Sequence, residues 1–204
     1  MNAALKRTCD ALVQEFHLIP EERRHLLEKL SAYIQQKVQL GKEVHLVYVC
    51  THNSRRSHFG QIWAKAAAGY FGIPRVYTYS GGTEATAFHP NAIKAAERAG
   101  FRIVRNDDSS NPKYDVFTDD AEQPSVCFSK VYHHEANPAK DFAAVMTCSD
   151  AEENCPFIPG VELRIATTYH DPKQSDGTAQ QDETYLERCL QIGRECLYVF
   201  SKVK

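Results

Sequence analysis

The stretch VHLVYVCTHNSRRS, residues 44–57, decides the fold of this chain. Residues 44–49 form a short, apolar and β-branched run, which is typical of a strand buried in a parallel sheet. Residues 50–56 are polar, and from Ser57 to Tyr70 apolar residues recur at helical spacing. A strand, a polar loop and a helix in this order are typical of proteins in which the two elements alternate, so the stretch predicts an α/β fold.

The alternation continues on both sides of this stretch. Toward the N-terminus we expect two helices within residues 1–41. Toward the C-terminus we expect strands at 75–79, 101–104, 142–147 and 162–167, and helices at 90–99 and 178–202. Two further strand-like runs, 113–118 and 126–132, are spaced as a hairpin. This order predicts a mostly parallel sheet that helices cover on both faces.

The composition argues against several classes of protein. The chain carries 24 basic and 26 acidic residues, a net charge of −2, which does not recruit nucleic acid or an anionic membrane. No apolar run approaches the roughly 18 residues that span a bilayer. Residues 1–18 are mixed and charged, unlike a secretory signal. We therefore expect a cytoplasmic protein that binds neither nucleic acid nor membrane.

The chain contains seven cysteines, an odd number that does not suit a disulfide scaffold in a chain of 204 residues. No pair or cluster has the spacing of zinc ligands, so we expect no metal, no cofactor, and chemistry performed by thiols. Cys189 and Cys196 are in step with the apolar residues of the last helix and are predicted to be core residues. Cys9 and Cys127 receive the same interpretation.

The pattern Cys50-x5-Arg56 lies where the predicted strand ends and the helix begins, which is where such sheets bind ligands. Backbone N–H groups of a tight loop and of a helix N-terminus bind anions, and they stabilise a thiolate. Arg56 can hold two oxygens of an oxyanion with its planar guanidinium. Ser57 could donate a hydrogen bond to the thiolate, and Asn53 could brace the loop.

Residues 47–57 resemble the phosphate-binding loop of the low-molecular-weight protein tyrosine phosphatases and of the thioredoxin-coupled arsenate reductases that share their fold. The resemblance continues through residues 79–85 and 89–92, and it returns at Cys148 and at residues 171–172. It implies that Cys50 is the nucleophile, Arg56 the oxyanion clamp and Asp171 the general acid. The oxyanion-binding residues would be Thr51, His52, Asn53, Ser54, Arg55, Arg56 and Ser57. On the residues alone, Asp176 and Asp150 compete with Asp171, because Asp-Pro dipeptides often only start turns.

The segment from Cys148 to Cys155 separates the two activities. Arsenate reductases of the thioredoxin-coupled type carry a similar Cys-x6-Cys run, and the resemblance implies a relay in which Cys148 attacks Cys50 and Cys155 resolves their bond. The resulting Cys148–Cys155 disulfide would be reduced by thioredoxin. The alternative is that both cysteines are buried and act as small apolar residues. The polar, acidic stretch between them looks exposed, which favours the redox role.

The chain departs from the family at several positions. His52 stands where the loop usually has glycine, and histidine tolerates a positive φ better than most residues. Arg55 replaces a second cysteine and is expected to add positive charge near the mouth of the loop. Gln61 replaces a glutamate that some arsenate reductases use for a potassium ion. Residues 173–174 replace the aromatic residues of tyrosine phosphatases, which argues against a tyrosine substrate.

We therefore predict a single domain over residues 1–204. Its fold class is α/β, a three-layer sandwich with a four-stranded parallel sheet, low-molecular-weight phosphatase-like. A helical extension covers residues 1–41, and the core, 42–204, carries an insertion at about 106–141 whose hairpin extends the sheet. The first predicted function is reduction of arsenate, and the alternative is hydrolysis of phosphate monoesters through a cysteinyl-phosphate. A more remote alternative is a non-catalytic phosphate binder.

Overall fold

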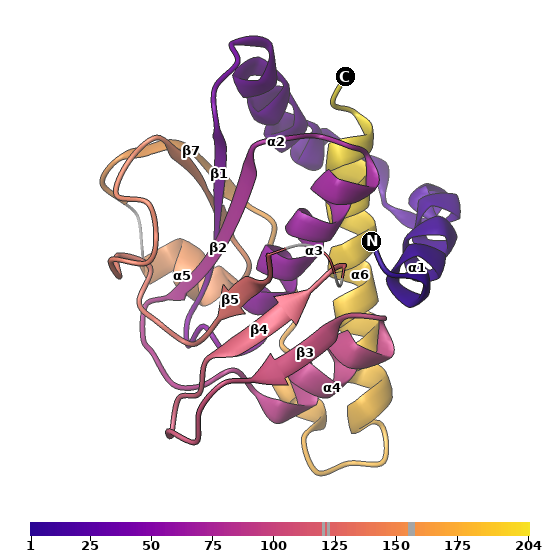
Figure 1. The fold of residues 1–204 in the computed structure, drawn as a ribbon, viewed down its shortest axis with the longest axis vertical. Coiled ribbons are helices and arrows are strands. Elements are labelled where there is room, and N and C mark those ends of the chain that lie inside the picture. Colours follow the sequence, from indigo (N-terminus) through magenta and orange to yellow (C-terminus); the bar gives the residue numbers. More distant parts are fainter. Residues whose placement is uncertain (120, 122, 155–157) are drawn as a thin grey trace.

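The computed structural model describes residues 1–119, 121, 123–154 and 158–204 (Figure 1). Its centre is a sheet of four parallel strands, in the order β2 (Val76–Gly82), β1 (Val44–Cys50), β6 (Phe142–Met146) and β7 (Val161–Ala166). The predicted parallel sheet is therefore confirmed. Because β1 lies inside the sheet, its carboxyl end, and Cys50 with it, is flanked by strands on both sides.

The side chains of β1 alternate between two apolar clusters, as the pleat of a strand requires. Leu46 and Tyr48 face the larger cluster, which the helices cover, whereas Val47 and Val49 face a smaller cluster on the other side. Figure 1 shows α3 (Arg56–Tyr70) and α6 (Gln181–Ser201) side by side on the first face, and α5 (Ser149–Asn154) on the second. The sheet is thus the middle layer of three.

The remaining helices border the first face. They are α1 (Ala3–Gln14), α2 (Glu21–Gln39) and α4 (Pro90–Arg98), and all three contact α6. The two N-terminal helices and the helix at 90–99 were predicted, but two short 3-10 turns, η1 (Phe16–Leu18) and η2 (Pro172–Ser175), were not. Among the described helices, none has the length and apolar character needed to cross a membrane.

The insertion forms a second sheet instead of extending the first. Its strands are β3 (Arg102–Arg105), β4 (Tyr114–Phe117) and β5 (Ser125–Cys127), and neighbouring strands are antiparallel. The predicted hairpin is present as β4 and β5, but the strand expected at 101–104 pairs with it and not with the parallel sheet. A single parallel bridge between Gly82 and Val131 joins the insertion to the end of β2.

Candidate active site

Residues 50–56, called here the Cys50 loop, connect the end of β1 to the start of α3. Three carbonyl oxygens of the loop accept hydrogen bonds from the segment after β2: Cys50 from Thr83 N, Thr51 from Glu84 N and Ser54 from His89 N, at 3.2, 2.8 and 3.0 Å. In contrast, the backbone N–H groups of residues 51–55 have no acceptor within the described part of the chain. A loop whose carbonyls are tied outward and whose N–H groups are free is suited to bind an oxyanion.

The Cys50 thiol lies at the bottom of this loop, 3% exposed, with its Sγ 3.0 Å from Ser57 Oγ. Asn53 Nδ2 donates to the same Ser57 oxygen over 2.8 Å. Because the Asn53 amide already fills an acceptor position of Ser57, the Ser57 hydroxyl proton is available to Cys50. The roles suggested for Ser57 and Asn53 from the sequence agree with this geometry.

The residue of the loop whose backbone adopts the left-handed conformation is Asn53 and not His52. Asn53 has a φ of 44°, and His52 is absent from the described residues with positive φ. The expectation that His52 tolerates positive φ was therefore misplaced by one position. His52 is instead exposed at the rim, with Nε2 3.6 Å from a Glu84 carboxylate oxygen. Asparagine is a common non-glycine residue in this conformation, so the loop forms without glycine.

Arg56 begins α3, and two acceptors hold its guanidinium. Nη1 donates to the Tyr169 carbonyl oxygen at 2.8 Å, and Nη2 to Asp171 Oδ2 at 2.6 Å. Its Nε is buried and has no hydrogen-bond partner in the described residues. Arg56 is therefore positioned by the segment after β7, and its Nε–H is among the donors that it keeps free for an oxyanion.

Asp171 caps the short turn η2, where its Oδ1 accepts a hydrogen bond from Lys173 N at 3.0 Å. Its other oxygen holds Arg56, and the side chain remains 28% exposed. The structure thus brings Arg56 and Asp171, two of the predicted site residues, into contact. A carboxyl group beside Arg56 and open to solvent can exchange a proton with a leaving group.

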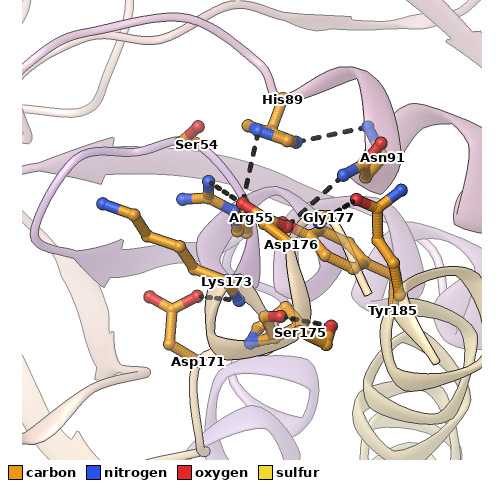
Figure 2. A network of polar contacts seen from close by, with 12 residues as sticks. Ser54, Arg55, His89, Asn91, Asp171, Lys173, Ser175, Asp176, Gly177 and Tyr185 are labelled. Carbon is orange, nitrogen blue, oxygen red and sulfur yellow. Dashed lines mark hydrogen bonds and ion pairs between the residues drawn. The ribbon is translucent and has the colours of Figure 1, made fainter. Parts of the chain in front are cut away.

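Arg55 lines a cavity beside the loop together with Ser54 and His89, but its guanidinium is largely buried and lies near the Asp176 carboxylate. Figure 2 shows its guanidinium in a network with Asp176. Nε donates to the Tyr185 hydroxyl at 2.7 Å, and Nη2 is 3.5 Å from Asp176 Oδ2. Tyr185 in turn donates to Asp176 at 2.7 Å. Burial, and then Arg55, lower the pKa of the neighbouring His89. The positive charge of Arg55 is compensated inside the protein.

A cavity of about 390 Å³ lies beside the second half of the loop. Its lining includes Ser54, His89 and Lys173, all visible in Figure 2. The Lys173 ammonium has no ion-pair partner within the described residues. The hydroxyl proton of Ser54 is not available within this cavity, because Oγ donates to the Ala87 carbonyl at 2.7 Å. Among the described residues, the lining of this cavity is therefore basic and contains no phenylalanine, tyrosine or tryptophan.

The insertion braces the Cys50 loop from outside, through residues that the sequence did not single out. Lys130 N donates to Asn53 Oδ1 at 2.9 Å, and Ser129 Oγ donates to the His52 carbonyl at 2.9 Å. Gly82 N donates to the Lys130 carbonyl at 2.8 Å. A Cβ on Gly82 would lie 2.6 Å from the Thr51 carbonyl oxygen, so only glycine permits this approach.

The segment around Arg56 is also tied to the N-terminal extension. Arg23 of α2 forms an ion pair of 2.8 Å with Glu195 of α6, and the Tyr169 hydroxyl donates to the same carboxylate at 2.7 Å. The Arg23 guanidinium lies 4.8 Å from the centre of the Tyr169 ring. Since the Tyr169 carbonyl holds Arg56, a chain of contacts leads from α2 to the loop.

Cys148 is buried and adjoins the loop, whereas Ser149 and Asp150 after it are exposed, as expected for the polar stretch. Its Sγ lies 3.5 Å from Thr51 Oγ1, and Ala151 N donates to it at 3.4 Å. Thr51 Oγ1 also donates to Asp150 Oδ2 at 2.6 Å.

Cys155 lies outside the described residues. The six described cysteines are all free thiols and buried, as predicted for Cys9, Cys127, Cys189 and Cys196.

No group of three or more histidine, cysteine or acidic side chains in the described ranges could hold a metal ion. Gln61 stands where some arsenate reductases have a glutamate for a potassium ion. Its Oε1 accepts a hydrogen bond of 2.6 Å from the Ser80 hydroxyl.

No family model matches the chain, but relatives and solved structures do. The arsenate reductase of Bacillus licheniformis is 28% identical over 143 residues, which are 70% of this chain and 84% of that protein. A solved structure of an arsenate reductase in the phosphate binding state has a TM-score of 0.53 at 19% identity, and covers 79% of this chain and 99% of its own. The low-molecular-weight protein tyrosine phosphatase from T. tengcongensis has a TM-score of 0.54 at 13% identity, with 79% and 100% covered. The curated relatives are arsenate reductases, and the fold is shared with arsenate reductases and low-molecular-weight tyrosine phosphatases, so the comparisons support an enzyme of one of these two types.

Proposed function

We propose that this enzyme reduces arsenate to arsenite through Cys50, Cys148 and Cys155, with thioredoxin as the electron donor. The observation that carries the proposal is the position of Cys148, whose thiol contacts Thr51, the residue directly after Cys50. A second thiol beside the nucleophile has no task in ester hydrolysis, but it is required to release a reduced product. The names of the relatives point the same way.

The first step binds the oxyanion. Free N–H groups of the loop and the guanidinium of Arg56 hold its oxygens, and the Cys50 thiolate attacks arsenic. One arsenate hydroxyl takes a proton from Asp171 and leaves as water. The product is a sulfur–arsenic(V) bond.

The next steps move two electrons. The Cys148 thiolate attacks Cys50 Sγ, a disulfide forms, and the electron pair of the sulfur–arsenic bond stays on arsenic, which leaves as arsenite. The Cys155 thiolate then attacks Cys148, frees Cys50, and leaves a Cys148–Cys155 disulfide. Two thiols of thioredoxin reduce this disulfide and restore the enzyme.

Hydrolysis of phosphate monoesters is the second candidate, and the contact of Asp171 with Arg56 favours it. An acid at that position can protonate the leaving oxygen while Cys50 takes the phosphoryl group. The basic, non-aromatic approach past Lys173 suits a small or anionic ester better than a phosphotyrosine.

One protein sample can separate the two candidates. Arsenite production is measured with arsenate, thioredoxin, thioredoxin reductase and NADPH, and phosphate release with an aryl phosphate. Cys148→Ser should stop arsenite release, whereas Cys155→Ser should allow one turnover and trap a Cys50–Cys148 disulfide, seen by mass spectrometry of a non-reducing digest. Both variants should keep aryl phosphate hydrolysis. Cys9→Ala, which removes a distant buried thiol, is the control and should behave as the parent.

The reductase proposal fails if both serine variants reduce arsenate like the parent, or if the parent releases no arsenite. Aryl phosphate turnover that requires only Cys50 would then support the phosphatase.

A further inference from the structure

A second cavity, of about 540 Å³, lies between the edge strand β2 and the insertion. Its volume is in the range of about 300–1,000 Å³ that small-molecule sites occupy. One wall comes from β2 and from α3, and the other from residues 123–128 and the segment after them. None of residues 50–57 lines it, so it is distinct from the Cys50 loop.

Three lysines line this cavity, Lys65, Lys113 and Lys130. In the ranges that the structure describes, none of them has a carboxylate within ion-pair distance. Glu135 is the acidic residue among the described lining residues, and it is exposed at the rim beside His134. The cavity therefore carries an excess of positive charge.

Lys130 is the unusual member of this group, because it is buried, with only 4% of its surface exposed. Its ammonium makes one long hydrogen bond of 3.5 Å to the Phe128 carbonyl and lies 4.6 Å from the centre of the Phe128 ring. An ammonium group has three protons to donate, so most of its capacity is unused. Buried charges are normally paired, since desolvation without a partner is costly.

Two neighbours add to the imbalance. The Lys113 ammonium lies 5.3 Å from the centre of the same Phe128 ring, so two cations interact with this one ring. Thr78, on β2, lines the cavity and has a buried hydroxyl without a partner in the described residues. The cavity thus offers donors from both walls, and Glu135 is the single carboxylate among its described lining residues.

We propose that this cavity binds a small polyanion, a molecule with two or more phosphate or carboxylate groups, through Lys130, Lys113 and Lys65. Three ammonium groups against one carboxylate are balanced by a dianion. The site is independent of the reaction at Cys50, and the proposal stands whether the enzyme is a reductase or a phosphatase.

The test is a titration of the ¹⁵N-labelled full chain with sodium pyrophosphate and, separately, with citrate, followed by NMR. The amide signals of Thr78 and Val126 report on the cavity, and those of Thr51 and Ser54 report on the Cys50 loop, so binding at the two places is told apart. We expect Thr78 and Val126 to shift with a dissociation constant below about 1 mM. Binding of pyrophosphate alone identifies the ligand class as phosphates, and binding of citrate alone as carboxylates.

Variants of the lysines complete the test. Lys130→Met should weaken binding at the cavity by about tenfold or more, and Lys113→Gln by about threefold, because charge-assisted hydrogen bonds are lost. Lys113 is exposed, so its replacement does not threaten folding. Lys29→Gln removes an exposed charge from α2 and should leave the affinity unchanged. The proposal is overturned if neither anion shifts Thr78 and Val126 in a saturable way up to about 10 mM, or if the three variants bind alike.

Discussion

The backbone N–H of Lys130 donates a hydrogen bond of 2.9 Å to Asn53 Oδ1, across 77 positions of the chain. Asn53 extends this connection, since its Nδ2 donates a hydrogen bond to Ser57 Oγ, and the Ser57 hydroxyl contacts the Cys50 thiol. The insertion is thereby connected to Cys50, the proposed nucleophile, by three consecutive hydrogen bonds.

Replacement of Asn53 tests this connection. Asn53→Ala loses two buried hydrogen bonds. Alanine also lacks the polar side chain that helps asparagine to adopt a positive φ, so the free energy of unfolding should fall by about 2–4 kcal/mol. Asn53→Gly loses the same hydrogen bonds but fits the backbone, and should cost about 1 kcal/mol less. Urea denaturation of the two variants measures the difference. Equal losses in both would contradict the assigned backbone conformation.

Ser57→Ala should slow the step in which Cys50 leaves as a thiolate. The Ser57 hydroxyl is placed to donate to the thiolate, and a hydrogen bond to a charged group contributes about 1.5–3 kcal/mol, which is roughly 10- to 100-fold in rate. With an aryl phosphate we expect a slower steady state that follows an intact burst of phenol, as measured by stopped flow. Ser54→Ala is the matched control, because that hydroxyl is bound to the Ala87 carbonyl. A loss of the same size in both variants would mean that any change in this loop is harmful.

Asp171→Asn should affect esters with poor leaving groups most. An oxygen with a high pKa must be protonated as it leaves, whereas an activated phenol need not be. Asp176→Asn, which disturbs the contacts with Arg55, Tyr185, Asn91 and His89 but not those of Arg56, should lower all rates by a similar factor. The dependence of kcat/KM on leaving-group pKa gives the answer. If Asp171→Asn shows no steeper dependence than Asp176→Asn, Asp171 only positions Arg56.

The ion pair of Arg23 and Glu195 should matter for stability. Arg23→Met leaves the buried Glu195 carboxylate without its cation and should cost about 3–5 kcal/mol. The double variant Arg23→Met, Glu195→Met removes both charges and should recover part of this loss. Thermal or urea unfolding of the parent, both single variants and the double variant completes the cycle. Strict additivity of the two single losses would show that the side chains do not interact.

Lys130 should make stability depend on pH. Burial lowers the pKa of Lys130 from its ordinary 10.5 to about 8. Between these values the unfolded chain holds a proton that the folded chain lacks, so the parent gains stability as pH rises from about 8 toward 10.5. Below pH 8 the buried charge costs about 3 kcal/mol. Lys130→Met should therefore be more stable than the parent at pH 7, and this advantage should shrink by pH 10.

Urea unfolding of variant and parent at pH 7, 8, 9 and 10 measures this difference in stability. The substitution Lys130→Met leaves the backbone hydrogen bond to Asn53 in place. The thiol of Cys127 and the ring of His58 face Lys130, and burial raises the pKa of the first to about 12 and lowers that of the second well below its usual range. Both are neutral in this pH window, and the ammonium of Lys113 lies over the same ring as Lys130. A constant difference between variant and parent from pH 7 to 10 would show that Lys130 does not titrate there.

The sequence was sufficient to predict β1, the Cys50 loop and α3, because each depends on a local pattern of apolar and polar residues. It was not sufficient for α5, whose residues 149–154 contain a single apolar side chain, Ala151, and show no helical period. Nor could it choose the partner of β3, since a four-residue strand of mixed polarity pairs equally well with either sheet. Pairing is decided by tertiary contacts, which a strand's own sequence does not contain.

The candidate site shows the same limit. Cys50, Arg56 and Asp171 were identified from motifs, and the structure places the last two in contact. The burial of Arg55 could not be predicted, because its partner Tyr185 lies 130 positions away. The supporting role of Lys130 is performed by a backbone group, which leaves no trace in the identity of the residue.

That last feature affects how this protein can diverge. A hydrogen bond donated by the main chain at position 130 survives every substitution except proline, which has no N–H. The side chain at 130 is therefore free to drift, and with it whatever the neighbouring cavity accepts, while the support beneath Asn53 persists. In descendants of this enzyme, ligand preference at the insertion and chemistry at Cys50 could be inherited as separate traits.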